Sequence, residues 1–256
     1  MTLFQSFILG IVEGLTEFLP ISSTGHLILV QKILSLTESD VLMTFDIAIQ
    51  LGAILAVVIL YFSELWNMAM IKKLIIGFIP TGIIGVLVFK HIKALLGSPL
   101  IVVVSLFVGG AIIIFADRWY KKATQEIGVT SHIGYKQAFL LGLYQTLAII
   151  PGISRSGAMI VGGMYMRIEK KALTEFTFLL AVPTMCAATF YSIYKHPESV
   201  THLSNSLPLL VGFITSFVVA LIVIKMFITY IRTRSFAIFG YYRIIIALLA
   251  LFILIQ

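Results

Sequence analysis

An acidic pair lies inside an apolar stretch near the beginning of the sequence. Glu13 and Glu17 are four residues apart, a spacing that places both carboxylates on one face of a helix. Two neighbouring anions repel each other unless a cation lies between them. Mg²⁺ prefers oxygen ligands and often binds one or two carboxylates together with phosphate oxygens. The pair therefore indicates a divalent metal site or a general base, and helix capping or inter-helix hydrogen bonding is the structural alternative.

The residues that follow this pair form a polar break. The segment Pro20-Ile-Ser-Ser-Thr-Gly-His26 contains three hydroxyl groups, on Ser22, Ser23 and Thr24, and ends in an imidazole. A Ser or His beside carboxylates can act as a nucleophile, with a second group as base or proton donor. Hydroxyl groups at a broken helix are more often caps, so His26 is the stronger candidate.

A second polar break contains a cation. Arg155 lies between Ser154 and Ser156, after Pro151-Gly152 and before Gly157. A guanidinium binds phosphate or carboxylate through two hydrogen bonds, and the amides of a helix N-terminus add donors for an anion. The pattern predicts an anion site, and an ion pair with one of the two glutamates is the alternative. Further polar groups that could orient these side chains are Asp46, Gln50 and Glu175.

The composition requires a lipid environment for these groups. Of the 256 residues 60% are hydrophobic and only 11% charged, which excludes a soluble enzyme, a disordered chain and a disulfide scaffold, since Cys186 is the single cysteine. The net charge of +7 is spread over many short segments, so it indicates orientation in a membrane and not nucleic acid binding. The first twenty residues lack Lys and Arg, so no cleaved signal peptide is expected.

Hydrophobic stretches predict an all-α integral membrane protein with about six membrane-spanning helices. A crossing needs about 20 apolar residues. The candidate crossings are 41–62, 74–89, 100–116, 174–194, 208–229 and 243–255, the last extended back to Phe236 with Arg243 reaching the membrane boundary. Two further apolar regions, 3–30 and 137–166, are each broken by Pro, Gly and Ser. Each is expected to form a re-entrant hairpin of two half-length helices.

The two broken regions are similar to each other. A shift of 132 positions gives nine identities over residues 5–30, among them Ser22 with Ser154 and Gly25 with Gly157. The chain is therefore interpreted as one membrane domain, 1–256, with repeat halves 1–131 and 132–256. If the loops alternate sides, twelve Lys and Arg residues fall on one side and four on the other, and the halves have opposite orientation. Inverted repeats with broken helices are common in transporters.

Residues 13–26 and 151–158 resemble the two signatures of the undecaprenyl-diphosphate phosphatase family associated with bacitracin resistance. The segments 45–53 and 175–183 also resemble family segments, in the same order, so the resemblance covers nearly the whole chain. It implies a multi-pass enzyme of the bacterial cytoplasmic (inner) membrane with an outward-facing active site. Such an enzyme removes the terminal phosphate of undecaprenyl diphosphate and depends on Mg²⁺ or Ca²⁺.

The resemblance also implies roles for individual residues. Glu13 and Glu17 match the metal-binding acidic pair, Ser23 and His26 the reactive residues, and Arg155 the phosphate-binding residue. The other substrate-binding candidates are Ser22, Thr24, Gln50, Ser154, Ser156 and Gly157. The nucleophile is Ser23, His26 or a metal-bound water, and Ser23 with help from His26 is favoured. Met159 stands where the family usually has Thr, so one hydroxyl group is missing.

The expected partners are the polyprenyl diphosphate substrate and membrane lipids, with a homodimer as a further expectation and no nucleic acid. A polyprenyl-phosphate flippase or an anion transporter on the same scaffold is the alternative function. The asymmetry between the halves favours an enzyme, because Glu13 and Glu17 align with Gln145 and Ile149 and His26 aligns with Ala158.

Overall fold

Helices account for nearly all regular structure in the part of the chain that the computed structural model describes, residues 1–37, 39–96, 99–195 and 207–255. Side chains are described for the same residues except 89–96 and 253–255. Strand-like pairing in these ranges is limited to one isolated bridge between Thr130 and Ile168. The prediction of an all-α protein is therefore confirmed.

In the described residues, five helices are long and apolar enough to cross a membrane, as expected for an integral membrane protein. They are α3 (Asp40–Leu60), α5 (Met68–Leu96), α6 (Pro99–Ile127), α9 (Lys170–Lys195) and α11 (Leu207–Ile231). The four-residue helix α4 (Phe62–Leu65) joins α3 to α5. Both α5 and α6 have 29 residues and exceed the predicted apolar stretches, because their ends continue into charged segments.

The last helix, α12, covers Ala237–Ile255 and so begins beside Phe236, as the sequence indicates. The prediction that Arg243 reaches the membrane boundary is wrong. Only 1% of this side chain is exposed, and its guanidinium donates hydrogen bonds to backbone carbonyls in the centre of the protein. A guanidinium with such partners does not need to extend to water.

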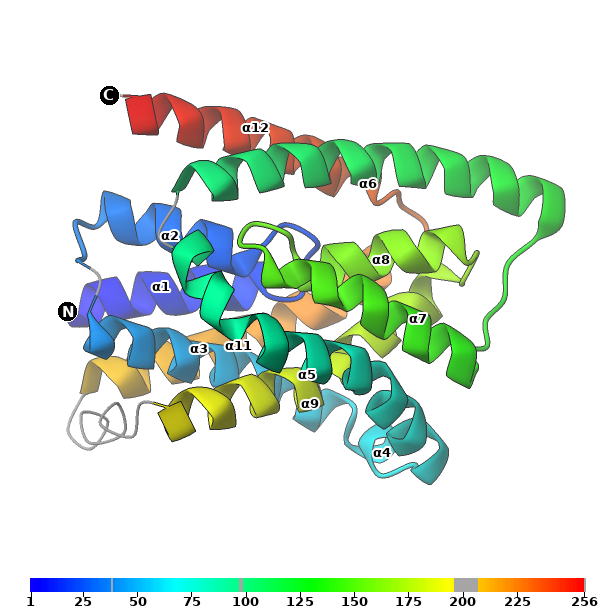
Figure 1. Ribbon diagram of the computed structural model, residues 1–256, viewed down its shortest axis with the longest axis horizontal. Helices are drawn as coiled ribbons and strands as arrows, with labels where there is room; N and C mark the ends of the chain where they lie inside the picture. Colours follow the sequence, from blue (N-terminus) through cyan, green and yellow to red (C-terminus); the bar gives the residue numbers. More distant parts are fainter. Residues whose placement is uncertain (38, 97–98, 196–206, 256) are drawn as a thin grey trace.

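Both broken regions consist of two helices separated by a short tip. In the first, α1 (Leu3–Thr16) is followed by α2 (Ser23–Ile33). In the second, α7 (Tyr135–Thr146) and the 3₁₀ turn η1 (Leu147–Ile149) precede α8 (Arg155–Tyr165). We call residues 17–22 the first tip and residues 150–154 the second tip. Figure 1 shows that the two tips meet in the middle of the molecule.

The second helix of each region begins in the same way. Ser22 caps α2 by accepting a hydrogen bond from the amide of Gly25 at 3.4 Å, and Ser154 caps α8 by accepting one from Gly157 at 3.1 Å. Capping Ser residues satisfy amides that have no partner within the helix. Pro20 precedes the first cap and Pro151-Gly152 precede the second, so each break follows from local sequence.

The helices pack in pairs that relate the two parts of the chain. Helix α1 packs against α11 and α7 packs against α5, while α3 contacts α9 and α6 lies along α12 (Figure 1). Helices α6 and α12 approach closely through Gly110 and Gly240. A Cβ atom at Gly110 would lie 2.7 Å from the carbonyl oxygen of Gly240, and one at Gly240 would lie 2.6 Å from that of Gly110. This reciprocal contact needs glycine on both helices.

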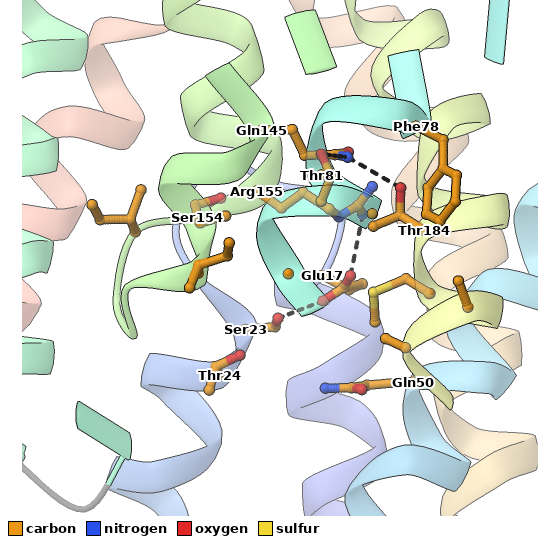
Figure 2. A pocket seen from close by; sticks show the side chains of 18 of the residues that line it. Glu17, Ser23, Thr24, Gln50, Phe78, Thr81, Gln145, Ser154, Arg155 and Thr184 are labelled. Carbon is orange, nitrogen blue, oxygen red and sulfur yellow. Dashed lines mark hydrogen bonds and ion pairs between the residues drawn. The ribbon is translucent and has the colours of Figure 1, made fainter. Parts of the chain in front are cut away.

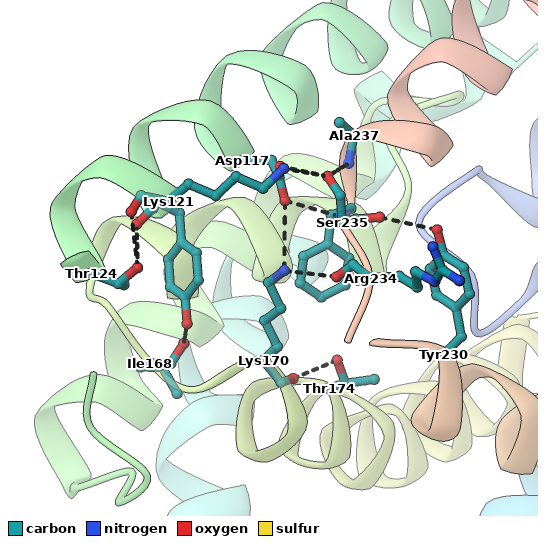
Figure 3. A network of polar contacts seen from close by, with 12 residues as sticks. Asp117, Lys121, Thr124, Ile168, Lys170, Thr174, Tyr230, Arg234, Ser235 and Ala237 are labelled. Atoms are coloured by element: carbon teal, nitrogen blue, oxygen red, sulfur yellow. Dashed lines mark hydrogen bonds and ion pairs between the residues drawn. The ribbon is translucent and has the colours of Figure 1, made fainter. Parts of the chain in front are cut away.

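A polar network joins α6, the start of α9 and the segment between α11 and α12 (Figure 3), at the end of the molecule opposite the α2–α3 connection (Figure 1). Asp117 near the end of α6 is fully buried and pairs with Lys121 at 3.0 Å. Its other partners are the hydroxyl of Ser235 at 2.6 Å, the backbone amide of Phe236 at 3.0 Å and the ammonium of Lys170 at 4.0 Å. Lys170 at the start of α9 donates to the carbonyl of Arg234 at 2.8 Å. The basic ends of α6, α9 and α11 therefore lie on one side.

Candidate active site

An ion pair connects the two tips. Arg155, the first residue of α8, donates from Nη2 to Oε1 of Glu17 in the first tip at 3.2 Å (Figure 2). The other oxygen of Glu17 accepts a hydrogen bond from the hydroxyl of Ser23, the first residue of α2. Phe18 anchors this tip, since its buried ring meets that of Phe178 on α9 edge to face at 5.2 Å. The chain therefore brings a cation, a carboxylate and a hydroxyl group to one point.

This point lies on the wall of a cavity of about 580 Å³. The cavity is bounded by both tips and by parts of α3, α5, α7 and α9 (Figure 2). Its polar lining residues are Glu17, Ser22, Ser23, Thr24, Gln50, Thr81, Gln145, Ser154, Arg155 and Thr184. Seven of these ten residues are among the sequence-predicted site residues. The apolar lining includes Phe78, Val86, Met185 and Ala188, so one cavity offers both polar and apolar walls.

Ser22 adopts an unusual backbone conformation beside Ser23. Its φ angle of 72° lies in the left-handed region, which non-glycine residues rarely occupy and which is common at functional sites. Its carbonyl oxygen lies 2.7 Å from Nδ1 of His26. The opposite ring nitrogen of His26 lies 2.9 Å from the hydroxyl of Tyr242 on α12, and the two rings stack. His26 does not line the cavity, and its contacts support the conformation of Ser22.

The two serines around Arg155 face different partners. Ser156 is buried and donates to the carbonyl of Leu19 in the first tip at 2.9 Å. Ser154 lies 2.9 Å from Ser156, oxygen to oxygen, and lines the cavity, whereas Ser156 and Gly157 lie behind it. Met159 is fully buried in an apolar cluster with Leu141 and Phe176. Its side chain does not line the cavity, so the missing Thr hydroxyl leaves the cavity wall unchanged here.

Glu13 is fully buried one helical turn before Glu17, and neither of its side-chain oxygens has a hydrogen-bond partner among the described residues. An isolated buried carboxylate is costly and calls for a proton or a cation. No cluster of three or more His, Cys, Asp or Glu side chains able to hold a metal occurs in the described ranges. A cation at Glu13 and Glu17 would therefore need further oxygen ligands from phosphate or water, which is how Mg²⁺ is often bound. The two carboxylates are ligands of the type that such a cation prefers, and of the two only Glu17 lines the cavity.

Two of the further candidates are engaged outside the cavity. Asp46 accepts two hydrogen bonds from the amide nitrogen of Gln31, at 2.8 and 3.0 Å. Glu175 pairs with Lys171 at 3.7 Å near the start of α9. Gln50, by contrast, lines the cavity.

Arg243 joins the two tips from behind, a contact that the sequence reasoning missed. Its Nη1 donates to the carbonyl of Pro20 at 3.4 Å and its Nη2 to the carbonyl of Gly152 at 2.9 Å. The same side chain holds α6 through the carbonyls of Ser105 at 3.0 Å and Leu106 at 3.3 Å. The available signal was an arginine six residues into a helix that is otherwise apolar.

Comparisons with known proteins show the family of this chain. Residues 6–249 match the family model described as bacitracin resistance protein BacA. The undecaprenyl-diphosphatase of Aquifex aeolicus is 51% identical over 97% of both chains, and that of Persephonella marina is 51% identical over 98% of both. The Wolinella succinogenes undecaprenyl-diphosphatase is 46% identical over 99% of both chains. The chain therefore belongs to the bacitracin resistance protein BacA family.

Proposed function

We propose that this protein hydrolyses undecaprenyl diphosphate to undecaprenyl phosphate and inorganic phosphate. Relatives that share about half of its residues over their full length are named for this activity. The observation that carries the proposal is the Arg155–Glu17 ion pair on the wall of a cavity with one polar and one apolar part. The transporter alternative is not favoured, because these relatives are named as phosphatases.

Arg155 binds the terminal phosphate in this proposal. Its guanidinium is held by Glu17 at 3.2 Å and by the carbonyl of Thr177 at 3.4 Å, and its Nε has no partner among the described side chains and backbone. The positive charge of the guanidinium attracts the phosphate, and the amides at the N-terminus of α8 add donors for it. Ser22, Thr24 and Ser154 add hydroxyl groups on the same wall.

Ser23 is the nucleophile that the geometry supports best. Its hydroxyl lines the cavity and already donates to Glu17, so the carboxylate is placed to take the proton when Oγ attacks phosphorus. The bond from phosphorus to the bridging oxygen then breaks, and undecaprenyl phosphate leaves with the electron pair. A water molecule later releases phosphate from Ser23. His26 keeps a supporting role in this scheme, through its contact with the Ser22 carbonyl.

Glu13 and Glu17 are the residues that would hold a divalent metal, Mg²⁺ or Ca²⁺. The metal would neutralise negative charge on the phosphate groups, the main requirement of phosphoryl transfer. The orphaned oxygens of Glu13 support this placement. The apolar wall formed by Phe78, Val86, Met185 and Ala188 would receive the beginning of the polyprenyl chain.

The two broken regions are proposed to be re-entrant hairpins of an inverted repeat with halves 1–131 and 132–256. Under the 132-residue shift α1 corresponds to α7, and the two helices have corresponding partners, α11 and α5. Gly10 on α1 meets the backbone of Gly212, and Gly142, its counterpart on α7, meets the backbone of Gly77. The contacts of α3 with α9 and of α6 with α12 join matching helices of the two halves, as a two-fold relation would.

The active site is proposed to open to the outer face of the bacterial inner membrane. The cavity is lined by residues 78–86 in the middle of α5 and by residues 184–191 in the later part of α9. Both helices begin at basic segments, Lys72-Lys73 and Lys170-Lys171, and the network in Figure 3 gathers the basic loops at that end. Basic loops face the cytoplasm, so the cavity belongs to the opposite side.

Two substitutions test the proposed reaction. We expect Arg155→Ala and Glu17→Ala to abolish phosphate release from a polyprenyl diphosphate, because each removes one side of the ion pair at the cavity wall. Phosphate release by the purified variants in detergent is the measurement. A matched control is Arg234→Ala, whose exposed side chain lies in the loop before α12. Normal turnover in both site variants would refute the assignment.

A further inference from the structure

A second polar group lies on the side of Arg155 opposite Glu17 (Figure 2). It consists of Thr81 on α5, Gln145 on α7 and Thr184 on α9, and all three line the cavity. The amide nitrogen of Gln145 donates to Oγ1 of Thr81 at 2.8 Å and to Oγ1 of Thr184 at 3.1 Å. One side chain therefore ties three helices together at the cavity wall.

The orientation of this amide is determined by its neighbours. Thr81 donates its hydroxyl hydrogen to the carbonyl of Gly142 at 3.1 Å, and Thr184 donates its own to the carbonyl of Leu180 at 2.7 Å. A hydroxyl has a single hydrogen, so both threonines can only accept from Gln145. The NH₂ group must face them, and both of its hydrogens are used. The acceptor that this group leaves without a partner is the side-chain oxygen of Gln145.

That oxygen is buried and has no hydrogen-bond partner in the described part of the chain, and Gln145 is only 1% exposed. Leaving a buried acceptor without a partner costs about 1–3 kcal/mol, so a ligand that donates a hydrogen bond is favoured there. The oxygens of an ionised phosphate cannot donate, and the last proton of a phosphate monoester leaves at about pH 6. The polyprenyl chain has no donor either. Water remains as the reactant that can donate.

Water also suits the other unused group in this part of the cavity. Nε of Arg155 is a buried donor without a partner among the described residues. A water molecule both donates and accepts, and buried waters are typically found where about three polar groups need partners. Gln145 supplies an acceptor and Arg155 a donor on the same cavity wall.

We propose that Gln145 is a positioning residue that holds the water consumed in hydrolysis, an inference that rests on the proposed phosphatase function. In the second step the oxygen of this water bonds to phosphorus, and the bond from phosphorus to Oγ of Ser23 breaks with its electron pair on Oγ. Glu17 returns to Oγ the proton that it took in the first step and accepts one proton of the water. Inorganic phosphate leaves, and Glu17 releases that proton to solvent.

The two halves of the chain differ in charge at the position of Gln145. Under the 132-residue shift Gln145 aligns with Glu13, so an amide stands where the first half has a carboxylate. An amide oxygen accepts a hydrogen bond from water without adding negative charge beside a diphosphate. The neutral side chain therefore suits a water site better than the carboxylate of the first half.

Gln145→Met tests the proposal, because it preserves the approximate length of the side chain and removes its polar atoms. Misplacing a reacting group by about 1 Å can cost about a hundredfold in rate, so we expect kcat to fall by about tenfold or more with KM nearly unchanged. Gln137→Met on the same helix is the control, since Gln137 caps the start of α7 and is absent from the cavity lining. Melting temperatures of both variants report on folding.

A nucleophile-partition assay distinguishes the loss of a positioned water molecule from a general loosening of the fold. With methanol added, the enzyme distributes the phosphoryl group between water and methanol. Loss of the water position changes the ratio of methyl phosphate to phosphate, whereas a loosened fold lowers both products together. An unchanged ratio with unchanged kcat, or a raised KM with unchanged kcat, overturns the water assignment. If wild-type protein is inactive or Arg155→Ala is active, the proposed function itself has failed.

Discussion

Arg243 carries a positive charge into the centre of the protein, where backbone oxygens surround it. Its four hydrogen-bond acceptors are carbonyls of both tips and of α6, and no carboxylate of the described residues forms an ion pair with it. The carbonyls of Pro20 and Gly152 lie in irregular backbone, where a buried carbonyl needs a donor when water is absent. The guanidinium can satisfy several of them at once because its five hydrogens form a rigid plane. Arg243 therefore fixes the position of Pro20 relative to Gly152, on which the Arg155–Glu17 contact depends.

We expect Arg243→Met to lower both stability and activity. The substitution leaves the buried carbonyls of Pro20 and Gly152 without this donor, at a cost of about 2 kcal/mol or more. The carbonyls of Ser105 and Leu106 lie within α6 and keep the hydrogen bonds of that helix. Arg243→Lys should recover only part of the loss, because an ammonium cannot reproduce the planar geometry. Melting temperature and turnover of the two variants are compared with those of Arg234→Met in the exposed loop. Equal melting temperatures for Arg243→Met and wild type would contradict this account.

At the scale of helices, the breaks could be predicted from sequence and the contacts between helices could not. The signals that end α1 and begin α2 lie within a few residues, in Pro20 and the capping Ser22. Arg243, by contrast, contacts residues 91 to 223 positions away along the chain, so nothing near it in sequence reveals its partners. The lengths of α5 and α6 were underpredicted because hydropathy marks only the apolar part of a helix.

The contact between α6 and α12 controls where Arg243 lies, and Gly110 sets the distance between these helices. A Cβ atom at Gly110 would lie 2.7 Å from the carbonyl oxygen of Gly240, closer than packed atoms allow. We expect Gly110→Val to separate the helices, lower the melting temperature by several degrees and reduce turnover. Gly134→Ala is the control, because a Cβ there meets its nearest neighbour at 3.7 Å. Wild-type stability in Gly110→Val would show that this contact is not tight.

At the scale of the whole molecule, the polar residues form two separate groups, a basic network and the lining of the cavity. The basic network of Asp117, Lys121 and Lys170 lies at one end, and the cavity lies beside the middle of α5 and the later part of α9. Charge asymmetry in the loops indicated this arrangement from sequence, because it depends only on which segments carry Lys and Arg. The position of the cavity depends on packing among six helical segments, which the sequence alone does not report.

Labelling of single cysteines tests the orientation. In a Cys186→Ser background, Thr37→Cys marks the loop between α2 and α3, and Lys122→Cys marks the end of α6; both positions are exposed. Residue 37 belongs to the side opposite the basic loops, so a maleimide that cannot cross membranes should label Thr37→Cys in intact cells with an accessible inner membrane. Lys122→Cys should react only after the membrane is disrupted, because its loop carries the Lys and Arg excess that faces the cytoplasm. The reverse labelling pattern would place the cavity on the cytoplasmic side, where the proposed substrate would have to be reached from inside.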